Sequence, residues 1–278
     1  MAAWRVAFLI AVLFILAGVA ATVSVPTGST ILLATTTSTR DSGLLDYLLP
    51  VFSQETGIGV RFVAVGTGLA LDMGRRGDAD VLLVHAPAAE LAFMAEGQGL
   101  CRSRVMRNQF IVVGPASDPA GVHGLANATI AFGRILSARS IFVSRGDNSG
   151  THIMERTIWS WVGYQPGPST DPWYRETGQG MAATLELASQ LEGYTLTDDG
   201  TFLVRRPTLS LDIDVTNDPP LQNFYSVIPV NPGRHPDVNW QFAVAFAEWL
   251  VSARGQTLIR DYVVGGEQPF HPEGLDGC

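Results

Sequence analysis

The sequence predicts an α/β fold with helix-covered, mainly parallel sheets. Short apolar runs of strand character alternate with stretches of helical spacing along most of the chain, which is the pattern of parallel strands joined by helices. Several polar turns stand between the end of a strand or loop and the start of a helix. With 278 residues, 46% of them apolar and 16% charged, the chain can form one large or two small well-packed domains.

The strand-like runs in the first half are short and bounded by turns. They span residues 30–34, 59–65, 80–85 and 109–114. Between the first two runs, apolar side chains recur at helical spacing, so a helix is expected there. These side chains are Leu44, Leu45, Leu48, Leu49 and Phe52.

The second half repeats this order, with strands expected at residues 141–144 and 225–230 and no clear pattern over residues 208–216. Two helices are expected to bury one apolar face each. The first face consists of Met154, Ile158, Trp161 and Val162, and the second of Met181, Leu185, Ala188 and Leu191. Residues 239–251 form a helical stretch that is apolar nearly all round and should be well buried.

The polar turn at residues 144–152 carries the clearest functional signal. Its sequence is Ser-Arg-Gly-Asp-Asn-Ser-Gly-Thr-His, and it stands between an apolar run and a helical stretch. A helix N-terminus presents free backbone N–H groups and about half a positive charge from its dipole. Arg145 adds a fixed charge, and Ser149 and Thr151 add hydroxyl donors. Together these groups predict an anion-binding corner.

Three further turns share this design, at residues 35–38, 66–68 and 178–180. Their candidate donors are side-chain hydroxyls and, in the last turn, backbone N–H groups. These candidates are Thr36, Thr37, Ser38, Thr67, Gly180 and Met181. Ligands of open α/β sheets lie outside the carboxyl ends of the strands. Several helix starts can therefore converge on one small anion.

Each candidate also has a local explanation. Serine and threonine within residues 35–38, and Ser149, can simply cap helices. Thr67 stands between two glycines, which permit a tight turn as well as a close approach to a ligand. Arg145 can form an ion pair with Asp147 instead of binding a ligand. Arg40 is expected to be solvated or to pair with the other half of the molecule.

The composition excludes several classes of function. A net charge of −8 argues against a broad nucleic-acid surface. All 18 basic residues are arginines, which excludes a P-loop lysine and a Schiff-base lysine. The histidines show no metal-ligand spacing, so no metal cation is expected. The two cysteines, Cys101 and Cys278, can pair in an exported protein or remain free thiols.

Residues 1–28 are expected to be a targeting segment. Trp4 and Arg5 precede a stretch of about 20 apolar residues, within which Val19-Ala20-Ala21 offers a small-residue cleavage site. A stretch of this length can also span a bilayer. We expect either a cleaved signal peptide or an uncleaved anchor, and export of the remaining chain in both cases.

Five segments, taken in order, resemble the substrate-binding proteins of tungstate-type ABC transporters. The first begins Thr-Thr-Thr-Ser-Thr-Arg-Asp-Ser-Gly, and the third is the Ser-Arg-Gly-Asp turn described above. The segments are residues 35–46, 77–85, 144–152, 174–181 and 194–198. The resemblance covers nearly all of the exported part, from about residue 31 to residue 259.

This resemblance implies a type II periplasmic-binding-protein fold, in which two α/β lobes are joined by two crossovers and hold an oxyanion between them. Lobe 1 would comprise residues 29–112 and 226–278, and lobe 2 residues 113–225. The family's contacts in the Thr-Thr-Thr-Ser and Ser-Arg-Gly-Asp segments carry over to four positions. These positions are Thr36, Thr37, Ser38 and Arg145.

One departure from the family pattern follows the anion-binding corner. Relatives often carry basic residues where this chain has Ile153 and Met154. We expect both side chains to face along the helix, away from the ligand.

The resulting expectation is a periplasmic or extracytoplasmic protein that captures a tetrahedral oxyanion for an ABC importer. Tungstate is the first candidate ligand and molybdate the next. The protein would be a monomer whose partner is the transporter permease, with no cofactor and no enzymatic activity.

Phosphate and sulfate are the alternative ligands, because Arg-x-x-x-Ser-Gly-Thr also resembles phosphate-binding proteins. A protonated phosphate benefits from a carboxylate acceptor, for which Asp41 and Asp147 are the candidates, whereas such a carboxylate would repel tungstate. Two further alternatives are an anchored oxyanion sensor and an exported hydrolase with Ser149 as nucleophile and His152 as base.

Overall fold

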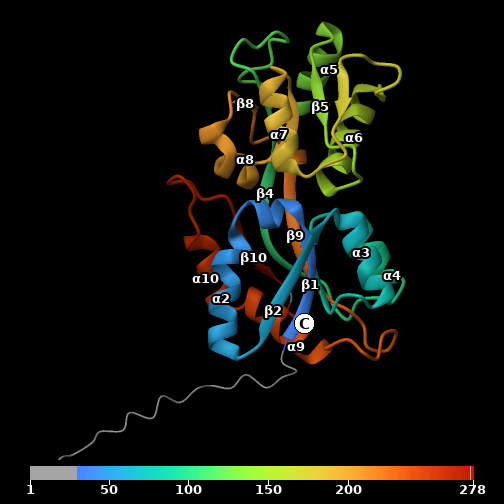
Figure 1. Ribbon diagram of the computed structural model, residues 1–278, viewed down its shortest axis with the longest axis vertical. Coiled ribbons are helices and arrows are strands. Elements are labelled where there is room, and N and C mark those ends of the chain that lie inside the picture. Colours follow the sequence, from blue (N-terminus) through green and yellow to red (C-terminus); the bar gives the residue numbers. More distant parts are fainter. Residues whose placement is uncertain (1–29, 276) are drawn as a thin grey trace, which may run out of the picture.

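The computed structural model describes residues 30–275, 277 and 278 of the chain. The expected targeting segment, residues 1–28, lies outside this part. Figure 1 shows two groups of helices and strands, one above the other, which we call lobe 1 and lobe 2. Two strands, β4 (Ser103–Gly114) and β9 (Gln222–Pro229), pass between them.

The sheet of lobe 1 has the strand order β10-β4-β9-β3-β1-β2. Its parallel part consists of β1 between β2 and β3, and β9 joins β3 in antiparallel orientation. The remaining strands of this sheet have the bounds β1 (Thr30–Thr36), β2 (Gly59–Val65), β3 (Val81–Val84) and β10 (His271–Leu275). The predicted strand at residues 59–65 is confirmed, and β1 continues two residues beyond its predicted end.

Within residues 30–275, six helices belong to lobe 1. They are α1 (Thr37–Asp41), α2 (Leu44–Thr56), α3 (Thr67–Arg76), α4 (Pro87–Ala95), α9 (Trp240–Val251) and α10 (Ala253–Asp261). The predicted apolar face of α2 is buried in full. Its Phe52 packs edge-on against Phe246 and Trp249 of α9, with ring centroids 5.0 and 5.3 Å apart. Helices α2 and α9 therefore pack in the same hydrophobic core.

Lobe 2 is built on the far end of β4. Residues 110–114 of β4 pair with β7 (Thr195–Asp198) and β8 (Asp212–Val215), whereas its earlier residues pair with β9. A separate parallel pair consists of β5 (Phe142–Ser144) and β6 (Tyr174–Glu176). The helices of lobe 2 are α5 (Ala128–Ala138), α6 (Gly150–Val162), α7 (Met181–Gln190) and α8 (Asp199–Arg205), with short 3-10 turns at Arg206–Thr208 and Pro219–Leu221.

The expected lobe boundaries near residues 112 and 226 fall within β4 and β9, and they stay a prediction. β4 begins six residues earlier than the apolar pattern indicated, at Ser103 rather than Gln109. Arginines and an asparagine interrupt that pattern, but the backbone of this stretch pairs with both β9 and β10. Among the described residues, none of the helices has the length and apolar character needed to cross a membrane.

The predicted buried face of α6 is wrong in part. Trp161 is 48% exposed, whereas Trp159 is buried against Phe132 and Phe142. Glu155 is also buried, and it accepts hydrogen bonds from Trp159 Nε1 and from a tyrosine hydroxyl. A charged residue in the middle of the buried face concealed that face from a count of apolar residues.

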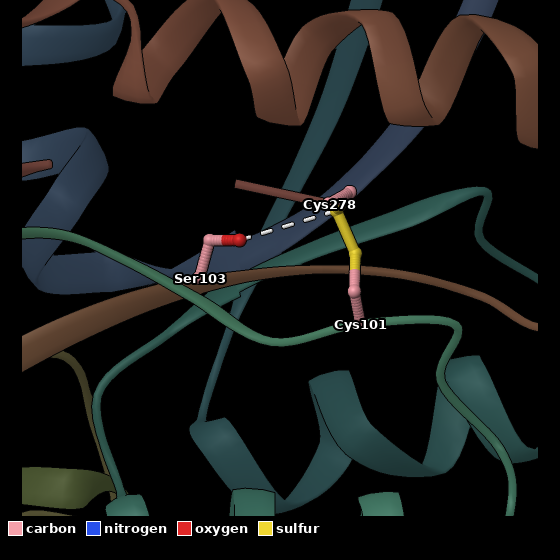
Figure 2. Close-up of a disulfide and its surroundings, with 3 residues drawn as sticks. All are labelled: Cys101, Ser103 and Cys278. Carbon is pink, nitrogen blue, oxygen red and sulfur yellow. Dashed lines mark hydrogen bonds between the residues drawn. A yellow bond between two sulfur atoms is a disulfide. The ribbon is translucent and has the colours of Figure 1, made fainter. Parts of the chain in front are cut away.

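The C-terminus is fastened to lobe 1 by a disulfide between Cys101 and Cys278 (Figure 2). The two Cα atoms lie 5.5 Å apart, within the usual range for a disulfide. The bond closes a separation of 177 residues and holds the end of the chain beside Ser103, the first residue of β4.

Candidate functional site

Four helix starts meet where the two lobes face each other. A methyl group added to Gly180, which caps α7, would lie 3.5 Å from Cβ of Thr37 at the start of α1. One added to Gly66, which caps α3, would lie 3.6 Å from the carbonyl oxygen of Asp147 and 3.7 Å from Cα of Ser149, the cap of α6. The four polar turns selected from the sequence therefore converge.

Arg145 lies at the centre of this junction. It follows β5 directly and is 2% exposed. Its Nη2 donates to Thr37 Oγ1 of lobe 1 at 3.1 Å and to Asp147 Oδ2 of lobe 2 at 2.5 Å. The guanidinium is thus held from two sides, and the ion pair with Asp147, which was the alternative to a ligand contact, is present. Its Nε is buried and has no hydrogen-bond partner among the described residues.

Three hydroxyl groups, like the Arg145 Nε, are buried and lack a hydrogen-bond partner among the described residues. The side-chain oxygens of Ser38, Thr67 and Thr151 are buried, and within the described part of the chain none has a hydrogen-bond partner. Leaving a buried polar group unpaired costs about 1–3 kcal/mol, and more when it is charged. Four such atoms on residues predicted to bind one anion are best explained by a ligand that pairs with them.

Two of the predicted hydroxyls have local partners. Thr36 caps α1, and its Oγ1 lies 2.9 Å from Thr39 Oγ1. Ser149 caps α6, as expected, by accepting the His152 backbone N–H at 3.3 Å. Met181 is fully buried in the core of lobe 2, so only its backbone can reach a ligand.

The two candidate carboxylate acceptors are differently placed. Asp147 Oδ1 accepts the Ser149 backbone N–H at 3.1 Å, so both oxygens of Asp147 have donors from the protein. Asp41 ends α1, one helical turn beyond Thr37, and pairs with Arg40 at 2.7 Å. Its second oxygen is buried and unpaired within the described residues. Arg40 itself is 49% exposed, as expected for a solvated side chain.

Ser149 and His152 do not form a nucleophile and base pair. The His152 ring receives the Asn148 backbone N–H at its Nδ1, at 3.0 Å, and burial lowers the pKa of this histidine. The Ser149 hydroxyl is bonded to the backbone of His152 rather than to its ring. Within the described residues, His, Cys, Asp and Glu side chains form no group of three that could hold a metal ion.

The environment of His85, the last residue of the family-like segment 77–85, was not predicted from the sequence. The structure buries this ring between the lobes, against Gly150 at the start of α6. A histidine directly after a buried strand is too common a pattern to have indicated such a position.

Two lobes joined by paired strands, with buried donors between them, define a binding protein for a small anion. A family described as PBP superfamily domain matches residues 21–254. The tungstate-binding protein TupA of Peptoclostridium acidaminophilum is 50% identical over 234 residues, which cover 84% of this chain and 81% of the relative.

Two solved structures are similarly close. The tungstate-binding protein TupA of Desulfovibrio alaskensis G20 is 46% identical with a TM-score of 0.75, covering 88% of this chain and 98% of the other. The tungstate ABC transporter protein of Geobacter sulfurreducens is 39% identical with a TM-score of 0.77, covering 84% and 98%. The chain belongs to the family of tungstate-type ABC transporter substrate-binding proteins, with the type II periplasmic-binding-protein fold. Because its relatives are binding proteins, the expectation that it is not an enzyme is confirmed.

Proposed function

We propose that this chain captures tungstate between its lobes and delivers it to the permease of an ABC transporter. The observation that carries the proposal is a set of buried polar atoms, on four separate segments of both lobes, that have no hydrogen-bond partner among the residues that the structure describes. These atoms are Ser38 Oγ, Thr67 Oγ1, Arg145 Nε and Thr151 Oγ1. A tetrahedral anion has four oxygens and can accept from all of these donors at once.

The strength of such a site is adequate for capture at low concentration. Hydrogen bonds to a charged group contribute about 1.5–3 kcal/mol each. About six of them, from these side chains and from the free N–H groups of helix starts, can offset ordering costs and approach the ~12 kcal/mol of nanomolar binding. An acidic protein can therefore hold a dianion, because the local donors outweigh its net charge.

Tungstate and phosphate differ in whether the ligand carries a proton. Tungstate and molybdate carry no proton at neutral pH, whereas phosphate keeps one for part of the time. Beside Arg145, both oxygens of the Asp147 carboxylate already accept from the protein, so the unpaired oxygen of Asp41 is the remaining candidate acceptor for a protonated ligand among the described residues. Tungstate is also what several relatives are named for binding. Molybdate, with the same charge and shape, is the expected second ligand.

The anion is held by side chains and backbone groups of both lobes. Arg145, Ser38, Thr67 and Thr151 contact the anion with their side chains, and Thr37 holds Arg145 in place across the lobes. The surrounding helix starts also contain Thr36 and Ser149. Gly180 and Met181 contribute their backbone N–H groups to the anion site. The protein acts outside the cytoplasm as a monomer, released by cleavage or tethered by its N-terminal segment.

Isothermal titration of the protein, stripped of bound anions, tests the proposal. Tungstate, molybdate, sulfate and phosphate are titrated separately at one ionic strength. We expect nanomolar binding of tungstate, with molybdate next and phosphate weakest. Tighter binding of phosphate than of tungstate, or no binding of any of the four, would overturn the proposal.

A further inference from the structure

The ring of His85 in lobe 1 rests on Gly150 in lobe 2. His85 follows β3, and Gly150 is the first residue of α6, between Ser149 and Thr151. A Cβ added to Gly150 would lie 2.7 Å from His85 Cε1, 2.9 Å from Nδ1 and 3.1 Å from the backbone oxygen of His85. No side chain fits between the lobes at this point.

The backbone of Gly150 does not itself require glycine. Gly150 is not among the glycines whose φ is positive, and it begins an ordinary helix. Glycine costs about 0.5–1 kcal/mol relative to alanine within a helix. The need for glycine at this position therefore comes from the approach of the His85 ring.

The His85 ring is fixed to both strands that join the lobes. Its Nδ1 lies 2.9 Å from Asn223 Oδ1 on β9, and the ring stacks on Tyr225 with centroids 4.7 Å apart. Asn223 Nδ2 in turn donates to Asn108 Oδ1 on β4 at 2.7 Å. The amide nitrogen of Asn223 thus donates, its oxygen accepts, and His85 Nδ1 carries a hydrogen. Burial lowers the pKa of His85 to about 4, so the ring is neutral at pH 7.

We propose that the contact between His85 and Gly150, the closing contact, sets how far the lobes close and thereby positions Ser149 and Thr151 around the ligand. His85 and Gly150 are positioning residues, since neither supplies one of the unpaired donors. The inference rests on the proposed function, because it assumes that closing of the lobes assembles the anion site. A larger residue at position 150 would hold the lobes apart without removing any donor.

The test begins with Gly150→Ala and Gly133→Ala as its matched control. Gly133 lies within α5 of lobe 2, and a Cβ there would have no atom within 4 Å. Both variants should have a melting temperature without ligand equal to or above that of the wild type, because alanine favours a helix. We expect Gly150→Ala to weaken tungstate binding by roughly tenfold or more, a loss of about 1.4 kcal/mol. Gly133→Ala should bind as the wild type does.

A second variant tests whether a clash between the added Cβ and the His85 ring causes the loss of binding. In the double variant His85→Ala/Gly150→Ala the ring atoms are gone, so binding should recover in part relative to Gly150→Ala. Full recovery is not expected, because the backbone oxygen of His85 stays 3.1 Å from the added Cβ. Unchanged tungstate binding in Gly150→Ala would overturn the role proposed for the closing contact. So would a double variant that binds tungstate more weakly than Gly150→Ala does.

The proposed function fails separately, if the wild type itself binds no tungstate. In that case small-angle scattering still reports on the closing contact. The radius of gyration of Gly150→Ala should exceed that of the wild type, whereas that of Gly133→Ala should not. Equal values for all three proteins would overturn the inference by itself.

Discussion

Arg145 Nη2 donates to Thr37 Oγ1 across the two lobes at a distance of 3.1 Å. The same guanidinium keeps its Nε buried and unpaired among the described residues. One side chain therefore both joins the lobes and presents a charged donor to the ligand. Anion binding and closing of the lobes are coupled through Arg145.

Replacing Arg145 by alanine should abolish high-affinity tungstate binding. The change removes the fixed charge, the Nε donor and the interlobe bond, and two charge-assisted hydrogen bonds alone are worth about 3–6 kcal/mol. Wild-type protein at 100 times the dissociation constant should gain ~2.7 kcal/mol from the ligand. In a thermal-shift measurement Arg145→Ala should show no shift and remain folded. Arg40→Ala, at an exposed position, is the control and should shift normally.

Replacing Thr67 or Thr151 by valine should weaken tungstate binding without lowering the stability of the ligand-free protein. Each change removes a buried hydroxyl that has no partner in the described part of the protein and keeps the shape of the side chain. The ligand-free protein should unfold at the same or a higher denaturant concentration, while tungstate affinity falls by roughly tenfold.

Thr35→Val is the matched control for these two variants. The Thr35 hydroxyl is buried as well, but it donates to the carbonyl oxygen of Leu83 at 2.8 Å. This variant should lose stability, by about 1 kcal/mol, because the carbonyl loses a donor. If Thr67→Val and Thr151→Val destabilise the protein equally and leave binding intact, their hydroxyls are not ligand donors.

Glu155 should make the stability depend on pH. Burial raises the pKa of this carboxyl group from its ordinary value of 4.5 to about 7. The folded state then holds a proton that the unfolded state loses, so stability falls as the pH rises from about 4.5 to 7. The loss is on the order of 3 kcal/mol.

Glu155→Gln should therefore be more stable than the wild type at pH 8 and similar to it at pH 4.5. The glutamine oxygen can still accept from Tyr174 and Trp159. Chemical denaturation across this range measures the difference, and Glu248→Gln at an exposed position is the control. A constant difference between Glu155→Gln and the wild type at all pH values would contradict the assignment.

The disulfide should stabilise the fold without affecting the ligand. Cys101→Ser/Cys278→Ser should lower the free energy of unfolding by about 2–5 kcal/mol, because the bond closes a long loop of the unfolded chain. Figure 1 shows the C-terminus at the end of lobe 1 remote from lobe 2, so tungstate affinity should stay unchanged. Calorimetry of the oxidised, reduced and double-serine proteins checks both statements, and a large loss of affinity would show that the bond acts on the site.

The helix starts of the site were predictable because their signals are local. The nine residues around Ser149 are enough to predict a helix cap and an anion site. The four residues of the Thr-Thr-Thr-Ser run are enough to predict the same. The partners of these residues were not predictable to the same degree, because they come from distant segments. Thr37 lies 108 positions from Arg145, and His85 meets Gly150 only after both lobes have formed.

Burial within helices was harder to predict than the helices themselves. The sequence indicated α6, but its apolar pattern favoured Trp161 over Trp159, because the face that is buried includes the charged residue Glu155. Glu155 is buried with tyrosine and tryptophan donors of its own. Only the three-dimensional arrangement of lobe 2 supplies those donors.

The central claim is that one tetrahedral anion pairs with the buried polar atoms of Ser38, Thr67, Arg145 and Thr151. Anomalous diffraction from crystals grown with tungstate tests this claim most directly, because tungsten is located independently of the protein. We expect one strong tungsten peak between the lobes, with the tungstate oxygens within hydrogen-bond distance of all four residues. A peak elsewhere on the protein, or none between the lobes, would contradict it.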